Sequence, residues 1–391
     1  MQNEKTRRTL LRLLCLLLTA ALLWRWQRIF YLCCADYIRS DMPAHVALAL
    51  SHSDYGLSSY LIRALWALFG PERGQTLLSL CLTANQLLGL GTLWLLLRAL
   101  FPETDGAALY LAALLAHVCG PWILPGQTQM YLGVYNGNLF HNMTLLFSRS
   151  FVPLALLFFC RLWDARRGGL SPWDAAGLTL SLLLATAFKP SFLAAFAPVV
   201  FCLLLADFAQ TRARGFGREF LIGACFLPAL GVMLWASSVL YAEDFAGESS
   251  SMALKSWTLA AFLGALVMYL RGLLLPLYTF GLQGRRETAL RGRFGILWLT
   301  NLAAIAEALL LTETGFREND GNFDWGALAL YPVTMGLSIA LLWRMFRAED
   351  RRTSRGRLRL ACGVVLLLGH LLTGLYCLAR PGHAGYDWFY F

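Results

Sequence analysis

The most informative segment of the chain runs from Arg161 to Arg218 and reads RLWDARRGGLSPWDAAGLTLSLLLATAFKPSFLAAFAPVVFCLLLADFAQTRARGFGR. Arginines cluster at both of its ends, and the apolar run between them is too long for one membrane-spanning helix. Excess arginine in short loops marks the cytoplasmic side, so this run must cross the membrane an even number of times. Pro190 lacks a helix donor and disfavours helical backbone at Lys189, which predicts a hairpin turning at these two residues.

The same alternation of arginine clusters and apolar runs extends over the whole chain. Hydrophobic residues make up 58% of the sequence and charged residues 14%, against about 25% charged in an average soluble domain. The formal net charge of +10 is therefore attributed to membrane orientation, and a nucleic-acid partner is not expected. The clusters are Arg7/Arg8/Arg12, Arg161/Arg166/Arg167, Arg212/Arg214/Arg218, Arg285/Arg286/Arg291/Arg293 and the arginines from Arg344 through Arg359.

Hydropathy and flanking charge predict one all-α integral-membrane domain over residues 1–391, with about eleven transmembrane helices. The N-terminus is expected in the cytoplasm and the C-terminus outside it. The lysine-poor composition is typical of a GC-rich bacterium, so the expected location is the bacterial inner membrane. The predicted spans are residues 10–32, 74–100, 106–124, 144–163, 173–188, 190–208, 219–241, 257–280, 294–312, 325–346 and 358–379.

The longest segment outside these spans is the first extracytoplasmic loop, residues 33–73. Its apolar stretch 57–69 is short and carries Arg63. If that stretch crossed the membrane, every later arginine cluster would move to the outside. We therefore expect juxtamembrane helices lying on the outer surface of the bilayer in this loop.

The first outer loop also holds the strongest candidates for chemistry. For a helix that begins near Asp41, positions 41, 45, 48 and 52 lie within roughly 40° of one line. Asp41, His45 and His52 would then form a polar stripe facing a cavity, with Val46 and Leu50 toward lipid or protein. Asp41 also precedes Pro43 by two residues, which is typical of a helix N-cap, so a structural role for Asp41 stays open. Asp36 and Arg39 lie just before it.

Two later outer loops are rich in groups that bind carbohydrate. The loop from Tyr131 to Asn142 has no charged residue but offers amides, tyrosines and a histidine, which suit sugar hydroxyls. The loop from Glu313 to Trp325 combines acids, amides and aromatic rings, although its acids could also simply follow the preference of an outside loop. The residues expected to contact a substrate in these loops are Asn138, His141, Glu313, Arg317 and Asn322.

Three basic residues lie outside the cytoplasmic clusters. Arg149 is predicted about six residues, or roughly 9 Å, below the outer end of its helix, and Lys189 lies at the outer hairpin turn. Charge within a membrane normally faces a cavity or a partner. Arg149 and Lys189 either neutralise a phosphate entering from the outer leaflet or pair with Glu307 or Glu313. Arg271, near Gly272 and Pro276, is interpreted as a packing or kink feature.

This layout resembles the integral-membrane glycosyltransferases of the GT-C superfamily. The resemblance covers the arrangement of most of the chain: a cytoplasmic N-terminus, a long first outer loop with acids near its start, many spans and polar outer loops. In that superfamily an acidic residue of the first outer loop acts as base, and the matching positions are Asp36 and Asp41. They stand five residues apart, so the strict Asp-x-Asp of some members is absent.

The resemblance implies sugar transfer from a polyprenyl-phosphate donor to a glycan, lipid or protein acceptor outside the cytoplasm, in contact with membrane lipids. Asp41 would take the acceptor proton, while Arg149, Lys189 or Arg39 stabilises the departing phosphate. No metal and no further cofactor would be required. Two alternatives stay open: a flippase or transporter of lipid-linked sugar, and an O-antigen-type polymerase or ligase that uses His45, His52 and Arg39.

Overall fold

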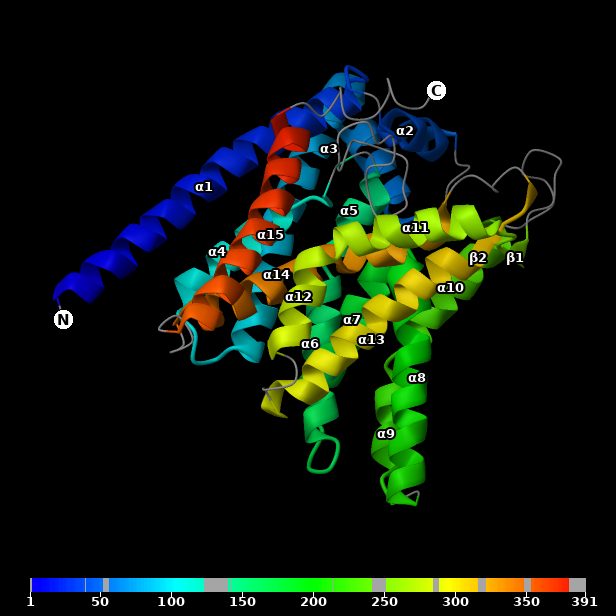
Figure 1. Cartoon of the computed structure of the whole chain (residues 1–391). Coiled ribbons are helices and arrows are strands. Elements are labelled where there is room, and N and C mark those ends of the chain that lie inside the picture. The colour runs from blue at the N-terminus through cyan, green and yellow to red at the C-terminus, as the bar shows by residue number, and fades with distance from the viewer. Residues whose placement is uncertain are drawn as a thin grey trace.

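The computed structural model is built almost entirely of helices (Figure 1). Among the residues that it describes, strand structure is limited to one two-stranded antiparallel sheet, formed by β1 (Met252–Leu254) and β2 (Leu311–Glu313). The structure describes residues 2–38, 40–51, 56–122, 140, 142–212, 214–240, 251–283, 288–315, 321–347 and 353–379.

The apolar helices coincide with the predicted spans. Within the described ranges, 7 helices are long and apolar enough to cross a membrane, or up to 9 if each of two bent helix pairs is one span. Two shorter apolar helices, α4 (Gly106–Val118) and α7 (Pro172–Phe188), lie at two further predicted positions. A multi-pass, mainly α-helical membrane protein is therefore indicated. The number of crossings stays a prediction, because it rests on length and composition alone.

The hairpin predicted at Lys189 and Pro190 is confirmed. Helix α7 ends at Phe188 and α8 (Ser191–Thr211) begins two residues after the Lys189 C-cap. The Lys189 backbone is extended, with φ −159° and ψ 121°, because the proline that follows disfavours the helical conformation there. Figure 1 shows the far end of α8 projecting from the rest of the molecule together with α9 (Phe216–Ala224).

The first outer loop contains helices, as predicted. After α1 (Gln2–Cys34), the short helix α2 (Met42–Leu50) starts next to Asp41. Helix α3 (Leu57–Leu100) then includes the stretch 57–69 and the following span, but its backbone leaves the helical conformation at Gly70, with φ 75° and ψ 175°. Only glycine adopts such a backbone without strain, and Pro71 follows it. The juxtamembrane part of α3 is thus set off from the span by a kink.

Two predicted spans are bent by more than 40° at a break, which is a correction to the sequence analysis. The predicted span 219–241 consists of α9 and α10 (Leu227–Leu240), bent by 42°. The predicted span 257–280 consists of α11 (Leu259–Gly272) and α12 (Leu274–Gln283), bent by 67°. Arg271 lies at this second break and donates from Nε to the carbonyl oxygen of Trp122 at 2.9 Å, in agreement with its interpretation as a kink feature.

A second correction concerns the span predicted over 294–312. Helix α13 (Thr288–Leu310) ends before Leu311, because residues 311–313 leave the helix to pair with β1. Leu311 aligns with Leu254, and Glu313 aligns with Met252. Three-residue strands are too short to give a period-2 signal, so the sequence alone does not reveal them.

Helix α14 (Trp325–Arg347) forms the centre of the molecule. Nearly all of its side chains are buried, and it packs against α3, α4, α8, α12, α13 and α15 (Ser354–Ala379). A helix that is apolar on every side requires packing partners on every side. Small residues permit close approach: a Cβ added at Gly336 would lie 3.3 Å from Leu93 of α3.

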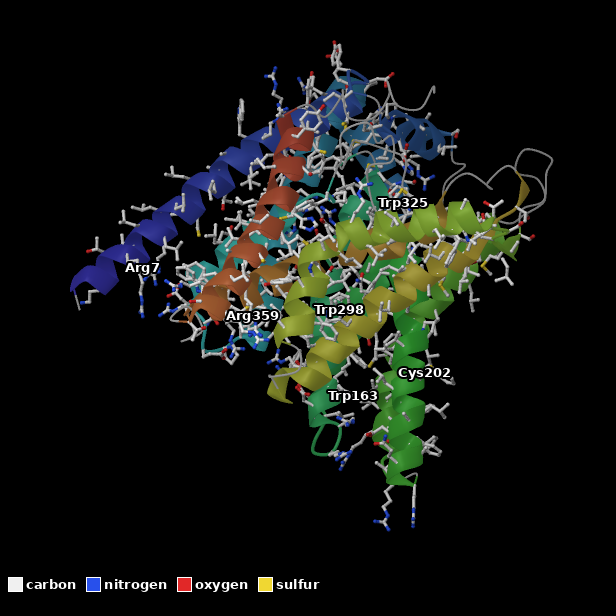
Figure 2. The ribbon with its side chains drawn as sticks, viewed as in Figure 1. Arg7, Trp163, Cys202, Trp298, Trp325 and Arg359 are labelled. Carbon is white, nitrogen blue, oxygen red and sulfur yellow. The ribbon has the colours of Figure 1, made fainter. Side chains whose placement is uncertain are left out.

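Charged groups from the loops assigned to the cytoplasm lie together at one end of the helices. Ion pairs join Arg8 to Asp105, Arg161 to Asp174, Arg166 to Asp207, Arg293 to Asp164 and Arg344 to Glu103. Every one of these pairs links residues that the arginine pattern places on the same side. Figure 2 shows Arg7 and Arg359 lower in the view than Trp325, which starts α14 at the opposite end.

Candidate functional site

The N-terminus of the short helix α5 (Met143–Arg149) is joined to the first outer loop. Asn142 is the N-cap of α5, and its Oδ1 accepts a hydrogen bond from the backbone nitrogen of Leu145 at 2.9 Å. Its Nδ2 donates to Oδ2 of Asp41 at 3.2 Å. One amide side chain therefore starts α5 and holds the Asp41 carboxylate beside that start. The sequence analysis did not anticipate this role of Asn142.

Asp41 does not behave as a side-chain cap. It occupies the N-cap position of α2, but its side chain forms no capping hydrogen bond there. Its contact with Asn142 instead connects two segments that are 101 residues apart in sequence. The carboxylate is half-buried, and it is not among the residues that line the pocket beside Arg149.

Asp36 ends helix α1. Its backbone is left-handed, with φ 58°. The amide of Tyr37 donates to the carbonyl oxygen of Leu32 at 2.9 Å, and the amide of Asp36 donates to that of Cys33 at 3.3 Å. This is the bonding pattern of a Schellman motif, in which short polar residues tolerate the left-handed position. The side chain of Asp36 is exposed.

The predicted polar stripe on α2 is only partly recovered. Met42 and Ala49 form the buried face of this helix, and His45 lies half-buried beside them. Leu48 and Leu50 are exposed, which suits the lipid-facing position expected for Leu50. Five predicted substrate contacts, Arg39, His52, Asn138, His141 and Arg317, lie outside the described residues.

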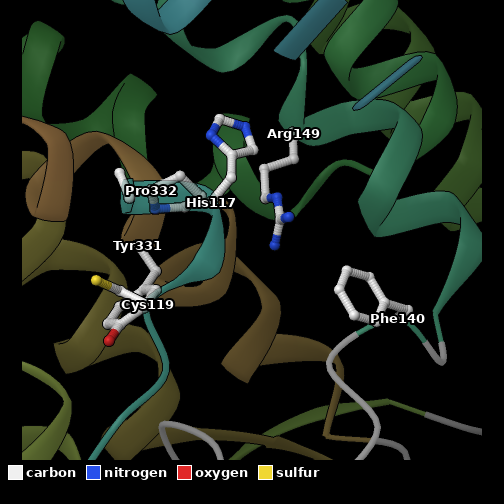
Figure 3. Close-up of a pocket in the computed structure, with 7 residues that line it drawn as sticks. His117, Cys119, Phe140, Arg149, Tyr331 and Pro332 are labelled. Atoms are coloured by element: carbon white, nitrogen blue, oxygen red, sulfur yellow. The ribbon is translucent and has the colours of Figure 1, made fainter. Parts of the chain in front are cut away.

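Arg149, the last residue of α5, is buried with 8% exposure. Figure 3 shows its guanidinium directed into a small pocket; the other residues lining it are Ala116, His117, Cys119, Phe140, Tyr331 and Pro332. In the part of the chain that the structure describes, no carboxylate pairs with Arg149 and no group accepts a hydrogen bond from its side chain. The alternative pairing with Glu307 or Glu313 is thus not seen. A buried cation without a partner is costly, and within a membrane such a charge normally faces a cavity or a partner.

The backbone around Arg149 is held by polar side chains of α3. Asn85 donates from Nδ2 to the carbonyl oxygen of Leu146 at 2.6 Å, and Ser150 Oγ donates to the carbonyl oxygen of Asn85 at 2.8 Å. Thr92 Oγ1 donates to the carbonyl oxygen of Ser150 at 2.8 Å. Pro153, early in α6 (Val152–Ala165), cannot donate to the carbonyl oxygen of Arg149. These features account for the break between α5 and α6 that leaves Arg149 at a helix end.

His117 and Tyr331 reach the pocket from α4 and α14. His117 Nδ1 lies 2.9 Å from the carbonyl oxygen of Ala113. The hydroxyl of Tyr331 lies 3.3 Å from Nδ1 of His370, which also contacts the carbonyl oxygen of Gly120 at 2.7 Å. Sequence reasoning missed both pocket residues, because a single polar side chain in an apolar helix does not show which neighbour it meets.

Lys189 lies next to the same region. Phe188 stacks on Phe147 with ring centroids 4.8 Å apart, and Ser148 Oγ donates to the carbonyl oxygen of Lys189 at 3.4 Å. The Lys189 ammonium is 4.8 Å from the centre of the Trp325 ring, within cation–π range. The hairpin turn thus packs against α5 one residue before Arg149.

The residues around β2 and the start of α14 form a separate polar cluster. Asn322 donates from Nδ2 to Oε2 of the buried Glu313 at 2.6 Å. Nearby, the Tyr269 hydroxyl donates to Oδ1 of Asp324 at 2.8 Å, and the Lys255 ammonium lies 3.9 Å from the same oxygen. Lys255, Tyr269 and Asp324 were not predicted as site residues. Their mutual contacts describe a satisfied structural network.

The reaction of this protein is indicated neither by a metal site nor by similarity to a known protein. Across the described ranges, no three or more histidine, cysteine, aspartate or glutamate residues are grouped so as to hold a metal ion. Comparison with protein-family models, with curated proteins and with solved structures finds no match to this chain.

Proposed function

We propose that this protein is a membrane glycosyltransferase that moves a sugar from a polyprenyl-phosphate donor to an acceptor on the extracytoplasmic side. The observation that carries the proposal is the buried Arg149 guanidinium, directed into a pocket and uncompensated by the described residues. Such a cation suits the single phosphate of a lipid-linked donor.

The position of Asp41 supports the same proposal. Asp41 is held at the start of α5 by Asn142, while Arg149 ends this helix. A helix rises about 1.5 Å per residue, so the backbones of residues 142 and 149 lie roughly 10 Å apart along the axis. A carboxylate and a long cationic side chain separated on this scale would flank an acceptor hydroxyl, an anomeric carbon and a phosphate.

The proposed step is a displacement at the anomeric carbon. The Asp41 carboxylate removes the proton of the acceptor hydroxyl, whose oxygen forms the new bond to the anomeric carbon. The bond from that carbon to the phosphate oxygen breaks, and its electron pair stays on the departing polyprenyl phosphate. Arg149 stabilises the negative charge that develops there, with Lys189 as a second cation at the neighbouring turn.

The proposal is tested with the full chain in lipid nanodiscs, supplied with polyprenyl-phosphate sugars and a panel of glycan, lipid and peptide acceptors. We expect release of polyprenyl phosphate with formation of a new glycosidic bond. Asp41→Asn and Arg149→Gln should each lower turnover by about 10²- to 10³-fold. The matched control is Arg161→Gln, because Arg161 is exposed, does not line the pocket, and pairs with Asp174 at the start of α7.

Different products distinguish the alternatives. Movement of an intact lipid-linked sugar across the bilayer, without a new glycosidic bond, would replace the proposal by a flippase. Products that are repeats of the donor's own oligosaccharide would indicate a polymerase. Full turnover by both Asp41→Asn and Arg149→Gln would exclude the displacement assisted by these two residues.

A further inference from the structure

The turn between α8 and α9 carries three exposed arginines. Arg212 follows α8 with a left-handed backbone, φ 49° and ψ 48°, Arg214 lies in the turn itself, and Arg218 lies in the first turn of α9. Arg218 Nη1 donates to the carbonyl oxygen of Arg166 at 3.4 Å. Within the described part of the chain, no carboxylate forms an ion pair with any of these three arginines. Their positive charge therefore faces the surroundings of the protein.

The acids nearest to this turn are buried beneath it. Asp207 is 5% exposed; its Oδ2 lies 3.1 Å from Arg166 Nε and its Oδ1 lies 3.7 Å from Arg167 Nη2. Glu219 is buried as well, and Gly215 leaves space for it, because a Cβ at that glycine would lie 2.8 Å from Glu219 Oε1. The negative charge is thus kept below the surface, and the outer face of the turn is basic.

Exposed phenylalanine rings lie beside these arginines. Phe216 and Phe220 of α9 are 58% and 63% exposed, and their ring centroids are 6.0 Å apart. Phe208 of α8 meets Phe216 edge to face, with centroids 5.9 Å apart. Phe201 and Leu205 continue the exposed apolar face along α8, because residues three or four positions apart are neighbours on one side of a helix. An apolar strip therefore leads away from the basic turn.

The length of this strip matches one leaflet of a bilayer. Phe201 and Arg212 are 11 positions apart, which corresponds to roughly 16 Å along the helix axis. The hydrocarbon core of a bilayer is about 30 Å thick, so the strip is about as long as half of it. Helix α9 packs mainly against α8, and Figure 1 shows the two helices projecting together from the rest of the molecule. The strip and the basic turn are thus accessible to lipid.

We propose that the turn between α8 and α9 binds an anionic phospholipid of the inner leaflet. The guanidinium groups of Arg212, Arg214 and Arg218 contact the headgroup phosphate, and an acyl chain lies along the apolar strip. Guanidinium groups bind phosphate through paired N–H donors, and anionic headgroups attract basic residues near the membrane surface. A zwitterionic lipid has no net charge and lacks this attraction. The arginine pattern predicts that this turn faces the cytoplasm, so the inference is independent of the proposed reaction on the other side.

The test titrates the full chain, purified in detergent, with phosphatidylglycerol or with phosphatidylcholine of the same acyl chains. Native mass spectrometry measures the bound fraction. The wild type should bind phosphatidylglycerol at least tenfold more tightly than phosphatidylcholine. The triple variant Arg212→Gln/Arg214→Gln/Arg218→Gln should bind phosphatidylglycerol about 10- to 100-fold more weakly, since each basic group near anionic headgroups contributes roughly fivefold. Its phosphatidylcholine binding should stay nearly unchanged. Replacement of the same three residues by lysine keeps the charge and should retain most of the preference.

A matched control removes three arginines from another cluster that is predicted on the same side. Arg355, Arg357 and Arg359 lie in the first turns of α15, and their replacement by glutamine changes the net charge by the same amount. This variant should keep the wild-type preference. A further variant, Phe216→Ser/Phe220→Ser, should weaken the binding of both lipids alike, because it shortens the apolar strip and leaves the basic turn in place. Thermal unfolding in the same detergent verifies that each variant is folded.

Three outcomes would overturn the inference. Equal losses in the two glutamine variants would show that overall charge matters and that this turn is not a site. Equal affinity of the wild type for the two lipids would show that the headgroup charge is not recognised. Displacement of phosphatidylglycerol by soluble glycerol phosphate at the same concentration would show that the turn binds a free anion and not a lipid. None of these measurements involves sugar transfer, so the proposed function would stand in each case.

Discussion

Asn142 donates a hydrogen bond to the carboxylate of Asp41 at 3.2 Å, and with the same side chain it caps the helix that ends in Arg149. The first outer loop and the wall of the buried pocket are thereby linked through one residue. Displacement of either segment is communicated to the other over a short helix.

Two substitutions of Asn142, by alanine and by aspartate, should separate its capping of α5 from its contact with Asp41. Asn142→Ala removes the cap and the Asp41 contact, so we expect a loss of about 1–2 kcal/mol in unfolding free energy and a fall in turnover. Asn142→Asp retains a capping oxygen but sets a second negative charge beside Asp41; it should keep most of the stability and still lose turnover. Thermal unfolding in detergent and initial rates measure the two quantities. Full activity in both variants would show that the contact does not serve the reaction.

Arg149 should matter for activity and not for stability. A buried charge without a partner destabilises the folded state, so Arg149→Met is expected to unfold at the same temperature as the wild type or higher. Donor binding, measured with a non-transferable polyprenyl-phosphate analogue, should weaken at least tenfold. A strongly destabilised Arg149→Met variant would show instead that the guanidinium is held by structural contacts.

The segment after α4 is packed tightly against α15 at Gly374. A Cβ added there would collide with the carbonyl oxygen of Val118, and backbone cannot give way by rotating a side chain. Gly374→Ala should therefore cost about 3 kcal/mol or more and displace Val118 and the neighbouring pocket residue Cys119. The control is Gly264→Ala in α11, where a Cβ meets nothing within 4 Å. Equal melting temperatures for the two variants would contradict this close approach of the two backbones.

The arginine pattern predicts the side of the membrane on which each turn lies. A reporter inserted at Gly168 or at Gly215 should be active only in the cytoplasm, because both positions neighbour arginine clusters. A reporter inserted between Lys189 and Pro190 should be active only outside. Cytoplasmic activity at that hairpin turn would mean that α7 and α8 do not cross, and the eleven-span topology would have to be revised.

Much of the fold could be predicted from the sequence because it depends on local composition. Charge parity required an even number of crossings between Arg161 and Arg218, and Pro190 located the turn between them. The depth of Arg149 in an apolar helix marked it as unusual. Arg271 and Pro276 indicated a packing or kink feature near Gly272, but the 67° bend angle could not be predicted. Bends of this size depend on which neighbours a helix packs against, and β1 and β2 are too short to leave a pattern.

The candidate site could be predicted only in part, for a different physical reason. Its contacts join segments far apart in the chain, such as Asp41 with Asn142, separated by 101 residues. No hydrophobic periodicity or residue spacing in the sequence indicates such a contact. His117 likewise lies 2.9 Å from a carbonyl oxygen one helical turn away and packs beside Gly89, contacts that the sequence does not indicate.

The ion pairs between the loops predicted to be cytoplasmic constrain how a ligand could reach the pocket. Asp207 is buried between Arg166 and Arg167, and four further pairs bridge neighbouring helix ends. Each exposed pair contributes only about 0–1 kcal/mol, but a rocking motion that opened an inward-facing vestibule would have to separate several of them together. Sideways entry of an apolar-tailed ligand from the lipid at the opposite end of the helices would separate none of these pairs.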